Sequence, residues 1–533
     1  MRWGSFLGSL VWPRTGFEVS RPRAGGFVLA GGFFIFALIL GLPSPQRFVI
    51  PDELAMHVVA ERVRQSLPIK ISSPLSSPAQ DLVHPRSMTV IRGAIVPEGF
   101  FFIAALYGTI QRVANTSALP WLLVAASTLL AAFAFKKILK FVDAPEFAAR
   151  VAPVVYPIIP PILYYTLHPY LANLLQLNLV IVSIALLIFC QSRSRGHAGI
   201  IVAGVVLGIA LALRPVEAVW IVPLVLVVVM VLKKTPWSML LLTVVGSLLP
   251  LAWSGVLQHS VFGSWFGVGY ASNPMLLPND AGGPWALVHA ALFPFGIHPG
   301  SVVRRFGQLM QLFWWWVPCA GVGLPSWLST KRRRAYVAVS TAVSLFLFVY
   351  YGSWQYSEPE DTGTMALSVG FVRYLLPMWA LWTPIVVSGI GALATVVHAR
   401  LRPILWAGVV SGFVISPMVI LPGNIQDQLQ ETRTYRARQE AVLALTSPDA
   451  ILVVKRSDKV FFPMRSVVVW YTQPQRVAEE LVDLIDSAPV YLDVVDQEGA
   501  SMLLPSTVEI EKKILVSNSE QLWKLTRASH RGQ

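Results

Sequence analysis

Long apolar runs, separated by short basic turns and by three longer polar stretches, make up most of this chain. The first run, residues 25–42, carries no charge and is just long enough to cross a bilayer, which takes about 20 apolar residues. Runs of this kind recur as far as residue 421 and then stop. The pattern predicts a polytopic α-helical membrane domain over residues 25–423, with about 11–13 transmembrane helices.

The later runs follow one another with few residues between them. They cover residues 94–110, 121–135, 148–190, 200–213, 218–232, 239–257, 309–324, 335–351, 374–397 and 404–421. Residues 148–190 are long enough for two crossings, but prolines interrupt the first half of this run. Because proline breaks helices, we expect the part that ends at His168 to be re-entrant or broken.

Composition supports a membrane protein. Only 13% of the residues are charged, against about 25% in soluble domains, and 55% are hydrophobic. The net charge of +14 is concentrated in the short turns, as expected for cytoplasmic loops, where it can also hold anionic lipid head groups. The charge therefore indicates membrane lipids as partners and not nucleic acid. Cys190 and Cys319 lack metal-ligand spacing, and no glycine-rich nucleotide-binding loop occurs.

Basic residues also predict the orientation of the chain. The arginine-rich segment of residues 1–24 is expected in the cytoplasm. The polar stretches 43–93, 258–308 and 352–372 then fall on the extracytoplasmic side. Within the first stretch, residues 53–65 alternate apolar and charged positions in a way that predicts a short amphipathic helix on the membrane surface.

Residues 424–533 form a separate region, because the charge density rises and the long apolar runs end there. Short apolar runs alternate with helical patterns, which predicts a small α/β domain on the extracytoplasmic side. The expected helices cover residues 426–444 and 477–485, and the expected strands cover 451–454, 467–471 and 490–494.

An acidic pair, Asp52-Glu53, follows the first apolar run. In so apolar a chain, carboxylates at a membrane edge are the first candidates for chemistry. Arginines and aromatic residues in the outer stretches and at the ends of the neighbouring runs join them in one candidate cavity. Arginine binds phosphate through a fixed fork of donors, and a carboxylate serves as general base for an acceptor hydroxyl. The candidate site residues are Asp52, Glu53, His84, Arg86, Arg92, Glu98, Arg214, Tyr270, Arg373 and Tyr374.

Five short motifs carry a resemblance to a known family. They are Pro51-Asp52-Glu53, Pro97-Glu98-Gly99-Phe100, Leu213-Arg214-Pro215, Phe262-Gly263-Ser264-Trp265 with Tyr270 after it, and Arg373-Tyr374-Leu375-Leu376-Pro377. They occur in the same order, and on one side of the membrane, as motifs of the GT-C superfamily of integral-membrane glycosyltransferases, which they resemble. The most similar branch is the protein O-mannosyltransferase-like one, which includes aminoarabinose transferases. The resemblance spans roughly residues 25–420.

The resemblance implies an inverting glycosyltransferase of the bacterial inner membrane that works on the extracytoplasmic face. It implies a polyprenyl-phosphate sugar as donor and a lipid, glycan or protein as acceptor. Asp52 would be the general base, and Arg373 would contact the donor phosphate. Glu53 would orient the acceptor or hold a divalent metal, the one candidate cofactor. Sugar, acceptor and carrier length stay open.

Two departures from the family pattern affect the phosphate site. Val96 stands where the family often has a lysine, and Leu54 to Met56 stand where a basic residue is expected after the acidic pair. Phosphate binding would then fall to Arg86, Arg92 or Arg214.

Other interpretations remain open at this level. A lipid or solute transporter, without glycosyl transfer, would show internal repeats and charges in mid-span, and the sequence shows neither. A non-catalytic membrane protein would depend only on its C-terminal domain. Glu53 also suits the N-terminus of a helix, and arginine at a helix end also anchors the helix at the membrane surface.

Overall fold

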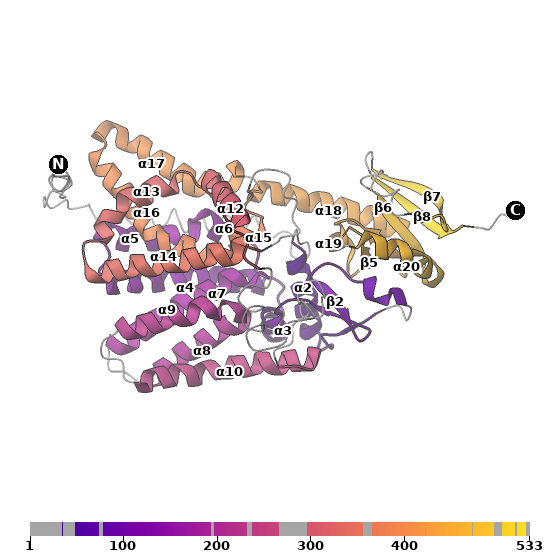
Figure 1. The fold of residues 1–533 in the computed structure, drawn as a ribbon, viewed down its shortest axis with the longest axis horizontal. Coiled ribbons are helices and arrows are strands. Elements are labelled where there is room, and N and C mark those ends of the chain that lie inside the picture. Colours follow the sequence, from indigo (N-terminus) through magenta and orange to yellow (C-terminus); the bar gives the residue numbers. More distant parts are fainter. Residues whose placement is uncertain are drawn as a thin grey trace.

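Two parts make up the structure, a helical bundle and a small sheet domain, with the long helix α18 (Ile425–Leu445) leading from one to the other (Figure 1). The computed structural model describes residues 35, 48 and 50–528, except 74–77, 193–196, 232–236, 266–295, 355–364, 422, 472, 495–503 and 518–519. The predicted first span, residues 25–42, lies outside the described residues apart from residue 35.

The bundle contains most of the helices of the chain. They are α3 (Phe102–Ala114), α4 (Leu119–Phe141), α5 (Glu146–Val155), α6 (Pro160–Thr166), α7 (Ala172–Ser192), α8 (His197–Leu213), α9 (Ala218–Val231), α10 (Trp237–Phe262), α12 (Pro299–Leu312), α13 (Trp316–Trp327), α14 (Lys331–Gly352), α15 (Gly370–Tyr374), α16 (Leu376–Val396) and α17 (Arg402–Val410), which continues as a π-helix over Ser411–Ile420.

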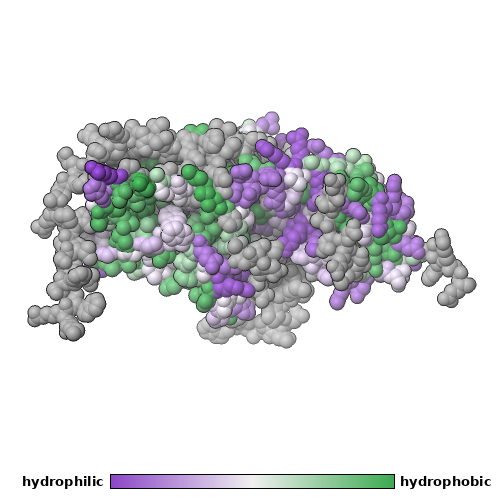
Figure 2. All heavy atoms as spheres, turned by 90° about the horizontal axis from the view of Figure 1, so that it is seen from above, coloured by the Kyte–Doolittle hydropathy of each residue, from purple (hydrophilic) through white to green (hydrophobic). Residues whose placement is uncertain are grey.

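Five of these helices, α4, α7, α10, α14 and α16, are long and apolar enough to cross a membrane. The number of candidate spans among the described residues rises to seven if each of two bent helix pairs is counted as one span. On one face, hydrophobic side chains lie over the bundle, and hydrophilic ones gather at its far end and where it meets the sheet domain (Figure 2). The predicted fold class, a polytopic helical membrane protein with a small α/β domain, is confirmed.

Proline sets the two sharp bends in the bundle. The segment expected to be re-entrant or broken is indeed broken, with a bend of 44° between Glu146–Ile158 and Pro160–Thr166. A second break, of 117°, separates α8 from the helical segment that begins at Pro215. Arg214 precedes this proline and has the extended backbone (φ −150°, ψ 85°) that a pre-proline residue favours. The break therefore places Arg214 at a corner, outside any regular helix.

The predicted second span is wrong at its start. Residues 94–97 form strand β3 (Ala94–Pro97) of a three-stranded sheet in the order β1 (Ile71–Ser72), β3, β2 (Met88–Ile91). The turn residues Arg92 and Gly93 have φ values of 51° and 75°, as a two-residue type I′ hairpin requires. The apolar residues that suggested a helix are therefore the buried positions of a hairpin, and the helix α3 begins only after it.

The predicted span 309–324 is also interrupted, because α12 ends and α13 begins within it. Phe313 and Trp316 both pack on Trp379 of α16, with ring centroids 4.3 and 5.3 Å away, and the chain turns between them. Elsewhere small residues bring helices close together. A Cβ at Gly208 of α8 would lie 2.5 Å from the carbonyl oxygen of Ser247 in α10, so this contact requires glycine.

The C-terminal domain is built on a five-stranded sheet in the order β5-β4-β6-β8-β7. Its elements are β4 (Ile451–Val454), α19 (Asp458–Phe461), β5 (Ser466–Val469), α20 (Pro474–Ser487), β6 (Val490–Val494), β7 (Val508–Ser517) and β8 (Glu520–Arg527). The first three strands are parallel and match the predicted α/β alternation. The antiparallel pair β7 and β8 was not predicted, because charged residues interrupt its apolar positions.

The first polar stretch and the C-terminal domain share one core. The short helix Pro78–Leu82 supplies Leu82, and Val83 follows it; both pack among buried residues of the C-terminal sheet and of α20. Val83 also forms an isolated bridge with Val468 of β5. The C-terminal domain is thus docked on the segment that carries the candidate residues His84 and Arg86.

Candidate active site

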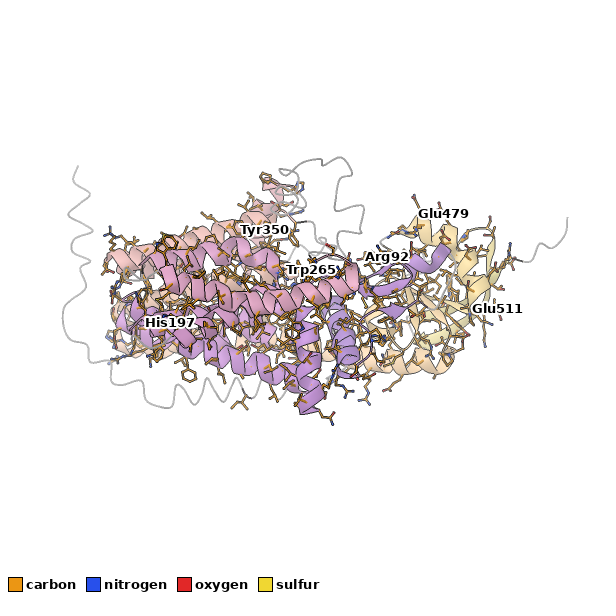
Figure 3. All side chains as sticks on the ribbon, turned by 90° about the horizontal axis from the view of Figure 1, so that it is seen from below. Arg92, His197, Trp265, Tyr350, Glu479 and Glu511 are labelled. Atoms are coloured by element: carbon orange, nitrogen blue, oxygen red, sulfur yellow. The ribbon has the colours of Figure 1, made fainter. Side chains whose placement is uncertain are left out.

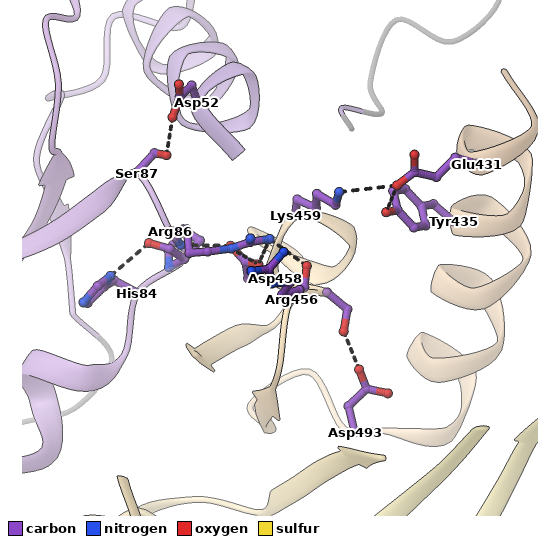
Figure 4. Close-up of polar contacts among 12 residues, drawn as sticks. Asp52, His84, Arg86, Ser87, Glu431, Tyr435, Arg456, Asp458, Lys459 and Asp493 are labelled. Atoms are coloured by element: carbon purple, nitrogen blue, oxygen red, sulfur yellow. Dashed lines mark hydrogen bonds and ion pairs between the residues drawn. The ribbon is translucent and has the colours of Figure 1, made fainter. Parts of the chain in front are cut away.

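Asp52 lies in the first turn of α2 (Pro51–Arg64), where a negative charge is favoured by the helix dipole. Its carboxylate is 2.7 Å from Nη2 of Arg373. It also accepts a hydrogen bond of 2.5 Å from the hydroxyl of Ser87 (Figure 4). About a third of the Asp52 side chain (33%) is exposed. Burial opposes the ionised form, but the Arg373 guanidinium and the Ser87 hydroxyl outweigh it and hold the pKa of Asp52 below its ordinary value. Asp52 is therefore an ionised carboxylate that a ligand can reach.

Two arginines from distant parts of the chain share one aromatic ring beside this carboxylate. The guanidinium carbons of Arg214 and Arg373 lie 4.8 and 4.9 Å from the ring centroid of Tyr374. Arg373 also donates from Nη2 to the Tyr374 hydroxyl at 2.9 Å. Their side chains are only 15% and 12% exposed. Among the described residues the buried Nε–H of Arg373 has no hydrogen-bond partner, whereas Nε of Arg214 faces the Glu217 carboxylate. The unpaired buried donor of Arg373 suits an oxygen of an anion.

A buried acid and an aromatic stack hold the Arg214 side of the site. Glu217 lies 3.4 Å from Nε of Arg214 and accepts hydrogen bonds from Trp220 and from the Tyr351 hydroxyl. The Tyr351 ring stacks on Tyr374 at 4.2 Å with an angle of 5° between the planes. The stack fixes the Tyr374 ring on which both arginines lie.

Glu53 turns away from Asp52 into the protein. Its carboxylate is 2.7 Å from Nδ1 of His168, and the two residues are 2% and 1% exposed. Within the described part of the chain, no group of three or more His, Cys, Asp and Glu residues lies close enough together to hold a metal ion. Glu53 therefore anchors the start of α2 on the broken segment, and its role as a metal ligand stays a prediction.

Two of the other candidates face the C-terminal domain. His84 bonds through Nδ1 to the carbonyl oxygen of Pro85 at 2.9 Å, and its backbone bridges to Val468 of β5. The Arg86 guanidinium lies 2.7 Å from the carboxylate of Asp458. These contacts use both side chains within the protein.

Of the remaining candidates, Arg92 and Glu98 lie on either side of strand β3. Arg92 is exposed at the tip of the hairpin β2–β3, toward the end of the bundle opposite His197 (Figure 3). The amide of Glu98 donates to the Ser87 carbonyl oxygen at 3.0 Å. Tyr270 lies outside the described residues.

The structure thus brings together Asp52, Arg214, Arg373 and Tyr374. The first and last of these are more than 300 residues apart in the sequence. Sequence reasoning missed Ser87, His168 and the role of Tyr351, since a serine or tyrosine in an apolar chain gives no distinct signal. Glu217 was visible in the sequence, as a carboxylate three residues after Arg214 at the end of the same apolar run.

A separate cavity of about 740 Å³ lies between α2 and the C-terminal domain. Polar residues on its wall include His57 and Glu61 of α2 and Lys459 of α19. None of the predicted site residues that the structure describes lines it.

Comparison with solved structures shows that the chain shares its fold with ArnT. The chain is similar to ArnT from Cupriavidus metallidurans bound to undecaprenyl phosphate, with a TM-score of 0.54 and 12% sequence identity over 96% of this chain and 100% of that one. For the same protein in the apo state the TM-score is 0.52 and the identity 13%, over 94% and 98% of the two chains.

An oligosaccharyltransferase from Archaeoglobus fulgidus is similar at a TM-score of 0.48 and 10% identity, over 90% of this chain and 71% of that one. No protein-family model matches the sequence, and no curated protein matches it.

Proposed function

We propose that the protein is a membrane glycosyltransferase that moves a sugar from a polyprenyl-phosphate carrier to an acceptor hydroxyl. The observation that carries this proposal is the group formed by an ionised, accessible Asp52 and two buried arginines, of which Arg373 keeps an unpaired donor. A carboxylate base and a cationic phosphate site are the two requirements of this reaction. The fold shared with ArnT, whose structure holds undecaprenyl phosphate, supports a polyprenyl carrier.

In the proposed step, the acceptor oxygen attacks the anomeric carbon of the donor sugar as its proton passes to the Asp52 carboxylate. The bond between that carbon and the phosphate oxygen breaks, and its electron pair leaves with the lipid phosphate. Arg214 and Arg373 stabilise the negative charge that develops there. A single displacement of this kind inverts the configuration at the anomeric carbon.

Arg373 connects the two halves of the reaction. In the absence of donor, it pairs with Asp52 and lowers the basicity of the carboxylate. A donor phosphate that competes for this guanidinium weakens the ion pair and raises the pKa of Asp52 when a base is needed. Asp52 and Glu217 also balance the charges of Arg373 and Arg214 before the donor arrives.

We place the reaction on the extracytoplasmic face of the bacterial inner membrane, in line with the basic turns at the other ends of the apolar runs. The acceptor is a lipid, glycan or protein that presents a nucleophilic hydroxyl. No step of the mechanism requires a metal.

The proposal is tested by turnover with a set of polyprenyl-phosphate sugars, using purified protein in detergent or proteoliposomes. Wild type is compared with Asp52→Asn and with Arg373→Gln. We expect wild type to release the lipid phosphate, Asp52→Asn to bind the donor but turn it over far more slowly, and Arg373→Gln to bind it weakly.

If wild type binds no donor of the set and releases no lipid phosphate, the glycosyltransferase proposal fails. Movement of a labelled lipid across the proteoliposome membrane would then support the transporter alternative.

A further inference from the structure

A buried carboxylate of the C-terminal domain holds the segment that contacts Asp52. Asp458, in the first turn of α19, is fully buried at 0% exposure. It accepts hydrogen bonds from the backbone amide of Arg86 at 2.9 Å and from Nε of Arg86 at 2.9 Å, and Nη2 lies 2.7 Å away. Nη2 of Arg86 also donates to the carbonyl oxygen of Arg456 at 2.7 Å (Figure 4). One acid thus fixes both the backbone and the side chain of Arg86.

The next residue, Ser87, carries the hydroxyl that donates to Asp52. Ser87 has a φ of 62°, in the left-handed region that serine seldom adopts. Such a conformation persists where surrounding contacts hold it. The contact on one side is the bond from the Arg86 amide to Asp458, and on the other the Ser87 carbonyl accepts from the Glu98 amide. The direction of the Ser87 hydroxyl therefore depends on both ends of this turn.

The same domain contains a second buried acid, Asp493, that makes no such contact. It pairs with Arg438 at 2.6 Å and accepts from the Ser457 hydroxyl, both within the C-terminal region. The contacts of Asp493 thus stay within the C-terminal region. Asp458 differs because its partner lies 372 residues away, beside the candidate base.

We propose that Asp458 is a positioning residue of the active site, which acts through Arg86 to aim the Ser87 hydroxyl at Asp52. The inference rests on the proposed function, since it assigns Asp52 as the base. It makes the C-terminal domain a part of the catalytic apparatus. It also assigns Arg86 to the docking of that domain and leaves the donor phosphate to Arg214 and Arg373.

The test is a double-mutant cycle in kcat between Ser87→Ala and Asp458→Asn. Each variant is expected to lower kcat by about tenfold, the size of one lost hydrogen bond to a charged group. Because Ser87→Ala removes the contact with Asp52 and Asp458→Asn acts only by misaligning that same contact, the double variant is expected to fall by about tenfold and not by the hundredfold of independent effects. Additive losses would overturn the inference.

The pH profile of kcat/KM gives a second readout. Asp52 faces Arg373, Arg214 and the Ser87 hydroxyl. Loss of the hydroxyl contact raises the pKa of the carboxylate, so both single variants are expected to shift the acid limb to higher pH by the same amount. A shift in Ser87→Ala without one in Asp458→Asn would contradict positioning through Arg86.

A third measurement does not depend on catalysis. Hydrogen exchange of residues 83–92 in detergent is compared in wild type, Asp458→Asn and the control Asp493→Asn. We expect faster exchange in this segment only in Asp458→Asn. Unchanged exchange in that variant overturns the inference even if wild type is an active transferase. Faster exchange supports it as a structural statement even if no donor is turned over, in which case only the proposed function fails.

Discussion

Replacement of Asp52 by asparagine removes the base while it keeps the shape of the side chain. The Ser87 hydroxyl can still donate to the amide oxygen, but the proton acceptor and the charge opposite Arg373 are lost. A positioned general base contributes about 10²- to 10⁴-fold to a rate. The pKa of Asp52 is lowered, which makes it a weak base, so we expect the lower half of this range.

The expected loss in kcat is therefore about 10²- to 10³-fold, or about 3–4 kcal/mol of activation free energy. Stability should change less. Breaking a fully buried ion pair costs about 3–5 kcal/mol, but Asp52 is one-third exposed and Arg373 keeps its contact with Tyr374, so we expect about 1–2 kcal/mol.

The assay is single-turnover release of lipid phosphate from a saturating donor, with donor affinity measured separately. Asp52→Asn should keep or improve donor affinity, because Arg373 no longer pairs with a carboxylate. Arg373→Gln is the matched contrast: it should weaken donor binding and raise KM. Full transfer by Asp52→Asn at normal expression would refute the assignment of the base, and equal loss of donor binding in both variants would refute the separation of their roles.

Three further changes test the fold around the site. Partial burial lowers the pKa of His57 to about 4, so between pH 6.5 and 4 the unfolded chain binds a proton that the folded chain does not; the free energy of unfolding should fall by up to about 3 kcal/mol as the pH drops through this window, and His57→Phe should flatten that slope. His168→Phe leaves the buried Glu53 without its partner and should cost about 3 kcal/mol in thermal unfolding, and Glu53→Gln should restore part of it if the pair is the cause. Gly208→Ala should lower the unfolding temperature measurably, because its Cβ meets a backbone oxygen at 2.5 Å, whereas Gly321→Ala, with nothing within 4 Å, should not; equal behaviour of the two variants would contradict close helix packing at this point.

The local pattern of apolar, charged and proline residues was sufficient to predict several elements. The charged and apolar alternation before Arg64 predicted α2, and the prolines before His168 predicted a broken segment. The strands at residues 451–454 and 490–494 were predicted with their observed bounds. These features depend on contacts within a few residues, or on the fixed geometry of proline.

The same reasoning failed where an apolar run had two local solutions. Residues 94–97 are apolar enough to begin a helix, but pairing with β2 through the Arg92-Gly93 turn makes them a strand. Hydropathy counts apolar residues and does not distinguish a buried hairpin from the end of a span. The glycine of the Arg92-Gly93 pair, between two short apolar runs, was the sequence signal that could have distinguished a hairpin from a helix here.

The sequence by itself determined that this is a polytopic membrane protein with an acidic pair after its first apolar run and a small α/β domain at its end. It also supplied the residues Asp52, Arg214 and Arg373 as candidates. Only the tertiary structure decided that Arg214 and Arg373 meet over Tyr374, that Asp52 pairs with Arg373, and that Glu53 turns inward to His168. The physical reason is that charges and hydrogen bonds act over a few ångströms in space, and hydropathy along the chain does not contain those distances.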